Sequence, residues 1–421
     1  MTDTHSIANL LLVLAAILAS GKLLAALAQR IGQPAVLGEL LAGVLLGPSA
    51  FGLLQPTDAV IHALSELGVI ILLFEIGLHT DFKSIAKVFG AATAVAVVGV
   101  VLPFVLGYAA VVGALGLDKV PALVCAAALT ATSIGISARV LSDLGLLKSP
   151  EGQVVLGAAV LDDIIGLIVL SVTVGIVTEG SWSVRGVVIT SAISIGFVVV
   201  ALTAGRLLAR HVFRSVEAIK APGTLAALAL AFALVLSSIA ASSGSAMILG
   251  AFAAGMILNT TDARGEIERA VTSIGHFLVP VFFASVGAAV ELSTFGEWGT
   301  LAVATVLIVA GVAGKYLAAY APWWFRGNKK LIGVAMIPRG EVGLIFAQMG
   351  LSTMAITPSL FSAITLMVLV TTFLAPPLLS RVSRGQRMAE REPEDMGIDD
   401  LVVGEWKHRS RQSVPDSSRA E

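Results

Sequence analysis

The sequence has few charges, few aromatic residues and a single cysteine. Asp, Glu, Lys and Arg make up 13% of the 421 residues, about half of the share found in an average soluble domain. Cys125 is alone, which excludes an intramolecular disulfide and any metal cluster built on several cysteines. Aromatic residues make up 6%, and no basic run with interleaved aromatics is present, so nucleic acid is excluded as a partner. The N-terminus also lacks the basic region that opens a cleaved signal peptide.

What the chain has instead is apolar sequence. Hydrophobic residues make up 57% of it, and the mean hydropathy is +0.93. A soluble core cannot bury so much apolar surface, so lipid must face much of it. Glycine occurs 42 times, which suits membrane helices that pack closely through small residues. The composition therefore predicts an all-α polytopic membrane protein, with the lipid bilayer as its surroundings.

About thirteen segments are apolar enough to cross a bilayer, which requires about 17–25 residues per helix. Their runs are continuous, whereas the strands of a barrel would alternate. The predicted spans are residues 7–28, 35–48, 63–79, 88–112, 120–141, 152–178, 185–209, 222–242, 245–259, 270–290, 298–322, 331–351 and 358–379.

The distribution of basic residues predicts the orientation. With the N-terminus outside, the cytoplasmic loops hold fourteen Lys and Arg, and the outside loops hold only Lys119 and Arg185. The C-terminus then lies in the cytoplasm. Residues 1–380 form the transmembrane domain, and residues 381–421 turn abruptly polar and charged. We expect that tail to be disordered, and it is too short for a nucleotide-binding domain.

A faint internal repeat links the two halves. Residues 37–46 match residues 249–258 at five of ten positions, with an offset of 212 residues. The two segments are the second and ninth spans, which run in opposite directions through the membrane. Inverted repeats of this kind are typical of secondary transporters. A match of ten residues in Leu, Gly and Ala sequence can also arise by chance.

Three charges lie where lipid disfavours them. Asp162 and Asp163 sit in the middle of the sixth span, and Lys315 lies well inside the eleventh. Buried charges in membranes mark substrate pathways, and a carboxylate there can hold either a proton or a cation. We expect Lys315 to pair with one aspartate. The alternatives are a misplaced helix cap for the pair and a lysine that extends toward the interface.

Two spans are interrupted. The fifth contains hydroxyls and glycine around Thr132 and Ser133, and the twelfth contains Arg339 and Glu341 beside a proline and glycines. Non-helical backbone at membrane depth is tolerated only where it is buried in protein or lines a cavity. One interruption in each repeat predicts two crossed broken helices, with Arg339 and Glu341 neutralising the half-helix ends. The alternative is an ordinary loop at Pro338–Gly340.

These motifs together resemble the monovalent cation:proton antiporter-2 family, and within it the NapA-type sodium/proton antiporters. The resemblance covers roughly residues 7–380. It is carried by GELLAGVLLGP (38–48), LGVI (67–70) with GL (77–78), TATS (130–133), LDD (161–163), GK (314–315) and PRGEVGLI (338–345). One departure is Glu75, at a usually apolar position, which makes it a possible accessory residue.

The resemblance implies a homodimer that works by an elevator movement. Scaffold and dimer contacts would come from about 7–79 and 222–290, and the transport core from about 88–178 and 298–379, with a linker helix at about 185–209. Asp163 would be the principal carrier of cation and protons, and Asp162 would alternate between the cation and Lys315. Na⁺ would bind at Asp163, Asp162 and Thr132, near Ser133.

The resemblance further implies electrogenic exchange of sodium or lithium for protons, because a double aspartate with the lysine marks that type. No cofactor and no enzymatic activity are expected, and the membrane is the bacterial cytoplasmic one. A potassium/proton antiporter on the same scaffold is the nearest alternative. A sodium-coupled symporter of organic anions is another, although it would leave Asp162, Asp163 and Lys315 without a role.

Overall fold

The regular structure of the chain is helical. The computed structural model describes residues 2–180, 183–205, 223–243, 246–261, 263–289 and 298–409, and every regular element within them is a helix. Eight helices in these residues are long and apolar enough to cross a membrane. They are α1 (Thr2–Arg30), α3 (Ala59–His79), α4 (Phe82–Gly113), α7 (Pro150–Glu179), α10 (Thr224–Ser242), α12 (Arg264–Ala288), α13 (Trp298–Ala318) and α16 (Pro358–Arg409).

The other helices are shorter. Five of them are apolar, namely α2 (Ala35–Leu46), α5 (Lys119–Ala128), α8 (Val184–Val200), α11 (Met247–Leu258) and α15 (Glu341–Ser352). Two more, α6 (Ile134–Asp143) and α14 (Lys329–Ala335), are halves of interrupted spans, and a π-helical turn, η1 (Ala201–Gly205), extends α8. The all-helical fold and the two interruptions agree with the prediction, and the count of thirteen spans stays a prediction.

Several helices begin where a side chain caps the free backbone N–H groups. Asp58 accepts from Val60 and Ile61 N–H at the start of α3, at 2.9 and 3.1 Å. Ser149 accepts from the N–H of Gly152 at 3.0 Å at the start of α7, where proline occupies the first turn. These caps satisfy donors that have no partner inside the helix, which matters most where water is scarce.

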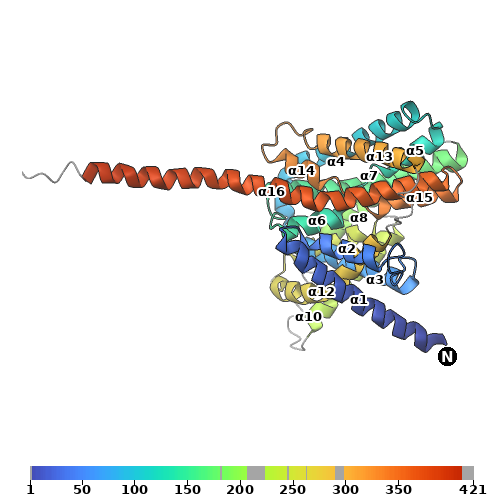
Figure 1. Cartoon of the computed structure of the whole chain (residues 1–421), viewed down its shortest axis with the longest axis horizontal. Coiled ribbons are helices and arrows are strands. Elements are labelled where there is room, and N and C mark those ends of the chain that lie inside the picture. The colour runs from blue at the N-terminus through green and yellow to red at the C-terminus, as the bar shows by residue number, and fades with distance from the viewer. Residues whose placement is uncertain are drawn as a thin grey trace, which may run out of the picture.

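The helices form two groups that lie against each other (Figure 1). In one group α3 packs on α11 and α12, and α2 packs on α1 and α12. In the other, α4 packs on α7 and α13, α13 on α16, and α15 on α5 and α16. The broken helices belong to the second group, and α6 also reaches α2 and α3 of the first. The site described below therefore lies beside the boundary between the groups.

Matching glycines make the internal repeat visible in the packing. A Cβ at Gly38 would lie 2.3 Å from the carbonyl oxygen of Leu24, and one at Gly250 would lie 2.4 Å from that of Leu236. Gly250 lies 212 positions after Gly38, and Leu236 lies 212 positions after Leu24. Such contacts leave no room for a side chain, so α2 approaches α1 through glycine in the same way that α11 approaches α10.

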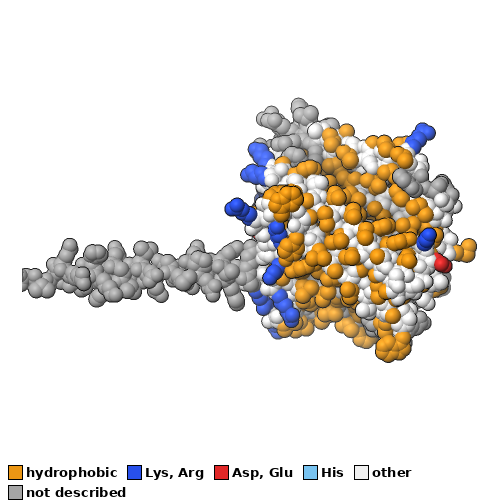
Figure 2. Space-filling model, turned by 90° about the horizontal axis from the view of Figure 1, so that it is seen from above, with side chains coloured by type: hydrophobic (Ala, Val, Ile, Leu, Met, Phe, Trp, Pro, Cys, Tyr) orange, Lys and Arg blue, Asp and Glu red, His pale blue; other side chains and the backbone are white. Residues whose placement is uncertain are grey.

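One end of the molecule is basic. Lys and Arg side chains gather at the end from which α16 projects, beside a broad hydrophobic belt (Figure 2). The N-terminal end of α1 lies at the opposite end (Figure 1). The start of α1 and the projecting end of α16 thus lie at opposite ends of the molecule, which fits the odd number of crossings that the sequence predicts.

The structure differs from the predicted disordered tail. Helix α16 continues through residues 381–409 and projects beyond the other helices (Figure 1). The segment contains five Arg and four Glu, which favour helix. It also extends a helix that is already formed, so it does not bear the cost of nucleation. The remaining tail residues, 410–421, lie outside the described part of the chain, as do residues 206–209 of the predicted linker helix.

Candidate ion site at the crossing of two broken helices

The two interrupted spans cross at their breaks. Residues 129–133 separate α5 from α6, and residues 336–340 separate α14 from α15. The backbone N–H of Ser133 donates to the carbonyl of Pro338 at 2.9 Å. The Ser137 hydroxyl donates to the carbonyl of Ala335 at 2.6 Å. These bonds satisfy peptide groups that the breaks release from helical pairing, as buried backbone requires.

A glycine lets the two breaks touch. A Cβ at Gly340 would lie 2.9 Å from both the Cβ and the hydroxyl oxygen of Ser133. Few real Cβ contacts are as short, so a side chain here would push the segments apart. The glycine of the predicted PRGEVG motif thus has a packing role at the crossing.

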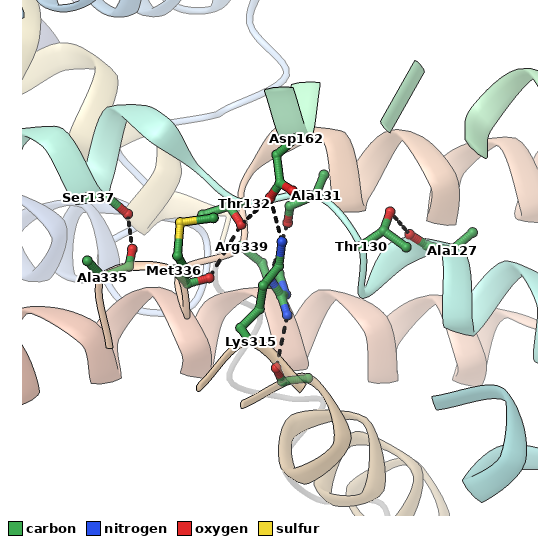
Figure 3. A network of polar contacts seen from close by, with 11 residues as sticks. Ala127, Thr130, Ala131, Thr132, Ser137, Asp162, Lys315, Ala335, Met336 and Arg339 are labelled. Carbon is green, nitrogen blue, oxygen red and sulfur yellow. Dashed lines mark hydrogen bonds and ion pairs between the residues drawn. The ribbon is translucent and has the colours of Figure 1, made fainter. Parts of the chain in front are cut away.

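Asp162 of α7 faces the crossing and is fully buried. Its Oδ2 accepts a hydrogen bond from the Thr132 hydroxyl at 2.6 Å. The same oxygen pairs with the ammonium of Lys315, which is also fully buried (Figure 3). The Thr132 hydroxyl lies in addition 3.4 Å from the carbonyl of Met336, across the second break. Asp162 therefore connects α7, α13 and the break of the first interrupted span.

Glycines also make room for the lysine. A Cβ at Gly314 would lie 2.6 Å from the backbone of Pro103, so α13 and α4 are in close contact there. A Cβ at Gly99 would lie 3.4 Å from both Cδ and Nζ of Lys315. The side chain thus runs along α4 toward α7 within the protein, which argues against the alternative that it extends to the interface.

Arg339 supplies a second buried cation. Its guanidinium donates to the carbonyls of Gly311 and Ala131, at 3.1 and 3.4 Å (Figure 3). Ala131 follows the C-terminal end of α5, where helix carbonyls concentrate partial negative charge. Arg339 therefore stands where the sequence predicts a compensating charge. Its predicted counterpart, Glu341, begins α15, and the placement of its side chain lies outside the described residues.

Asp163 faces a cavity, unlike its neighbour. It is 3% exposed and lines a space of about 210 Å³ together with Thr132, Ser133 and Glu66. Successive helical residues point about 100° apart, which explains why two adjacent carboxylates have different surroundings. One of them is bound by an ammonium and a hydroxyl, and the other can be reached from the cavity.

The cavity leads toward the end of the molecule opposite the basic one. A larger space of about 680 Å³ shares His62 and Thr365 of its lining and extends to Phe361 in the first turn of α16. Because α16 is continuous and projects at the basic end, its first turn lies at the other end (Figure 1). The carboxylate of Asp163 is thus accessible from one side of the membrane region.

At the other end, a polar contact links the two helix groups, and charged residues lie on either side of it. The Asp143 carboxylate, at the end of α6, faces the backbone N–H groups of the first two residues of α2. Arg139 pairs with Asp143 at 3.2 Å. Glu39 of α2 is 1% exposed and lies 3.5 Å from the ammonium of Lys22 on α1.

Glu75 is placed away from the crossing. Its Oε1 accepts a hydrogen bond from the Thr272 hydroxyl at 2.7 Å, which joins α3 to α12. One turn along, His79 lies 3.7 Å from Glu268 of the same helix pair. Glu75 thus lies at the contact between two helices of the first group, and its accessory role at the ion site stays a prediction.

Some contacts of the site were not predicted from the sequence. They include the carbonyl of Gly311, the small Gly99 beneath the lysine, and the hydroxyl of Thr372, which donates to the carbonyl of Arg339 at 2.7 Å. The spacing of Gly311 and Gly314 ahead of Lys315 could have indicated a close helix contact, because it places two glycines on one helix face. Thr372 carries no signal in the sequence.

Known proteins resemble this chain over most of its length. The family model described as "Sodium/hydrogen exchanger, transmembrane" matches residues 13–385. The high-affinity Na⁺/H⁺ antiporter NhaS3 of Synechocystis sp. is 40% identical, and the match covers 91% of this chain and 92% of that protein. The Na⁺/H⁺-K⁺ antiporter GerN of Bacillus cereus is 32% identical, with coverage of 87% and 94%.

A solved structure supports the fold independently. The sodium proton antiporter MjNhaP1 of Methanocaldococcus jannaschii matches with a TM-score of 0.65 at 18% identity, covering 89% of this chain and 98% of that one. The resemblance to cation/proton antiporters that the motifs predict is confirmed. The chain belongs to the sodium/hydrogen exchanger family.

Proposed function

We propose that this chain exchanges Na⁺ or Li⁺ for protons, with Asp163 as the group that carries them. The observation that carries the proposal is the contrast between two adjacent carboxylates. Asp163 lines a cavity, whereas Asp162 is buried against Lys315 and Thr132. Two relatives that match most of the chain are themselves named as Na⁺/H⁺ antiporters. The proposal involves no cofactor and no covalent chemistry.

Competition between cation and protons follows from the charges. A Na⁺ that reaches Asp163 brings a positive charge close to Lys315 and attracts Asp162 and the Thr132 hydroxyl as further oxygen ligands. The ammonium then loses its partner and releases a proton, and Asp163 releases another. One Na⁺ would replace two protons, so exchange would be electrogenic. In the reverse step, one proton returns to Lys315 and restores its pair with Asp162, and the other returns to Asp163.

Alternating access would use the boundary between the helix groups. The group containing α4, α7, α13 and the broken helices would move as the core, against a scaffold of α1–α3 and α10–α12. The contact of Asp143 with the start of α2 would then break when the site opens at the basic end. We place that end in the cytoplasm of a bacterial cell, with the N-terminus outside, and we propose a homodimer.

A potassium/proton antiporter remains the second candidate. It is favoured by one observation, because GerN, at 32% identity, is named as an antiporter of Na⁺, H⁺ and K⁺. Both candidates use the same carboxylates and differ in the cation that fits. Ion-dependent transport separates them.

The test is dissipation of a pH gradient in proteoliposomes on addition of Na⁺, Li⁺ or K⁺. We expect Na⁺ and Li⁺ to collapse the gradient with the wild type but not with Asp163→Asn. Asp58→Asn is the matched control, because Asp58 caps α3 outside the site and should leave exchange intact. An imposed membrane potential should alter the rate if exchange is electrogenic. A response to K⁺ alone would favour the second candidate, and no response to any cation would refute antiport.

A further inference from the structure

Two adjacent threonines on α16 bond differently. Thr371 and Thr372 are both buried, with at most 1% of their surface exposed. The Thr371 hydroxyl donates to Met367 and Val368 carbonyls of its own helix, at 2.8 and 3.0 Å. The Thr372 hydroxyl instead leaves the helix and donates to the carbonyl of Arg339 at 2.7 Å. A hydrogen bond from a threonine hydroxyl to a carbonyl of its own helix is common. The bond from Thr372 to another segment therefore requires a separate explanation.

The explanation lies in the carbonyls of the second break. Those of Ala335, Met336 and Pro338 receive bonds from the first interrupted span, through Ser137, Thr132 and the backbone of Ser133. The carbonyl of Gly340 receives one from Gly343 N–H at 3.1 Å. The carbonyl of Arg339 points to α16 instead, and Thr372 is its donor. Arg339 is fully buried, so without that hydroxyl its carbonyl would lose this hydrogen-bond partner in the protein interior, which is unfavourable.

Arg339 is therefore held at two ends. Its guanidinium is fixed by the carbonyls of Ala131 and Gly311, and its own carbonyl is fixed by Thr372. The preceding carbonyl, of Pro338, bonds to Ser133 N–H beside Thr132. A rotation of the peptide after Arg339 would therefore disturb both the guanidinium and the crossing. Thr132, the hydroxyl partner of Asp162, lies within that set of contacts.

We propose that Thr372 is a positioning residue for the cation site. Its hydroxyl fixes the peptide that follows Arg339, and through it the crossing that places Thr132, the hydroxyl partner of Asp162. Loss of the hydroxyl should weaken Na⁺ binding with a smaller effect on the maximal rate, because the carboxylates and Lys315 remain. The inference rests on the proposed function, since it assumes that Na⁺ binds beside Asp163.

The experiment replaces each threonine by the isosteric valine in the full-length protein. We expect Thr372→Val to raise the KM for Na⁺ by about 3- to 18-fold, the factor that corresponds to interhelical hydrogen bonds in membranes. Thr371→Val is the matched control, with the same burial and volume change, and should move KM less than about twofold. Thr372→Ser, which keeps the hydroxyl, should restore the wild-type KM.

A binding measurement separates positioning from stability. Na⁺ raises the unfolding temperature of a protein that binds it in the folded state. Both valine variants can lower the unfolding temperature without Na⁺, but only Thr372→Val should need more Na⁺ for the same rise. If Thr372→Val does not fold, Thr372→Cys, a weaker donor, must bind Na⁺ less tightly than Thr372→Ser. Equal affinities in that pair, or equal KM increases for the two valine variants, would overturn the inference. A wild type that does not respond to Na⁺ would instead refute the proposed function.

Discussion

The buried pair of Asp162 and Lys315 offers a test by a double-mutant cycle. The perturbations are Asp162→Asn and Lys315→Met, each alone and both together. Asn and Met have nearly the same size as the residues they replace, so packing changes little and the charge is what is removed. Both side chains are fully buried, and the ammonium and Oδ2 are in direct contact.

The expected magnitudes follow from what each variant leaves behind. Removing one member of a buried ion pair costs about 3–5 kcal/mol, because the other charge stays buried and unpaired. Lys315→Met leaves Asp162 with the Thr132 hydroxyl and next to a second carboxylate, so we expect the upper part of that range. Asp162→Asn leaves the ammonium near Asp163, which can then lose its proton and attract it, so we expect the lower part. The double variant removes both charges and should be more stable than Lys315→Met.

The assay is thermal unfolding of the four purified proteins in one detergent, at one pH and without Na⁺. The order of unfolding temperatures should be wild type, then Asp162→Asn, then Lys315→Met, with the double variant above Lys315→Met. Additive losses in the double variant would show that the two groups do not interact. That result would refute the pairing on which the proposed proton release depends.

Two further predictions concern glycine and glutamate. Gly340→Ala should raise the KM for Na⁺ and cost about 1–3 kcal/mol of stability through overpacking, because its Cβ would lie 2.9 Å from Ser133. Gly90→Ala on α4 is the control: a Cβ there would meet nothing within 4 Å, so the change should be neutral or slightly stabilising. Equal effects of Gly340→Ala and Gly90→Ala on the KM for Na⁺ would contradict the close contact at the crossing. Glu75→Gln should leave the KM for Na⁺ unchanged while altering stability by about 0.5–1.5 kcal/mol through its bond to Thr272. A large rise in the KM for Na⁺ with an unchanged unfolding temperature would indicate that Glu75 acts at the ion site.

The features of the fold that could be predicted are those that lipid imposes on sequence. Apolar runs, the basic asymmetry and charges at membrane depth are all local, so residues such as Asp162, Asp163 and Lys315 stand out without knowledge of their neighbours. The interruptions at Thr132 and Arg339 also stand out, because hydroxyl, proline and glycine interrupt continuous aliphatic sequence. The structure brings these residues together as expected.

Contacts made by ordinary residue types could not be predicted. Thr372 resembles the many threonines that bond within their own helix, and only the tertiary arrangement sends its hydroxyl to another segment. Glu75 stands out as a charge in an apolar run, but its bond to Thr272, 197 positions away in the sequence, could not be predicted. The prediction of a disordered tail has a different cause. Composition alone does not indicate that residues 381–409 continue an existing helix.

The two kinds of contact at α2 indicate where the molecule can move. Toward α12, a Cβ at Gly43 would lie 2.1 Å from the carbonyl oxygen of Ala284, so backbone lies directly on backbone. Toward α6, the described contact is polar, from the Asp143 carboxylate to N–H groups at the start of α2. Backbone contact through glycine cannot shift without losing its fit, whereas N–H groups at a helix start can exchange a carboxylate for water at little cost. If the two helix groups move as proposed, they would separate at the boundary beside α6, on the side of Asp163 away from the cavity that it lines.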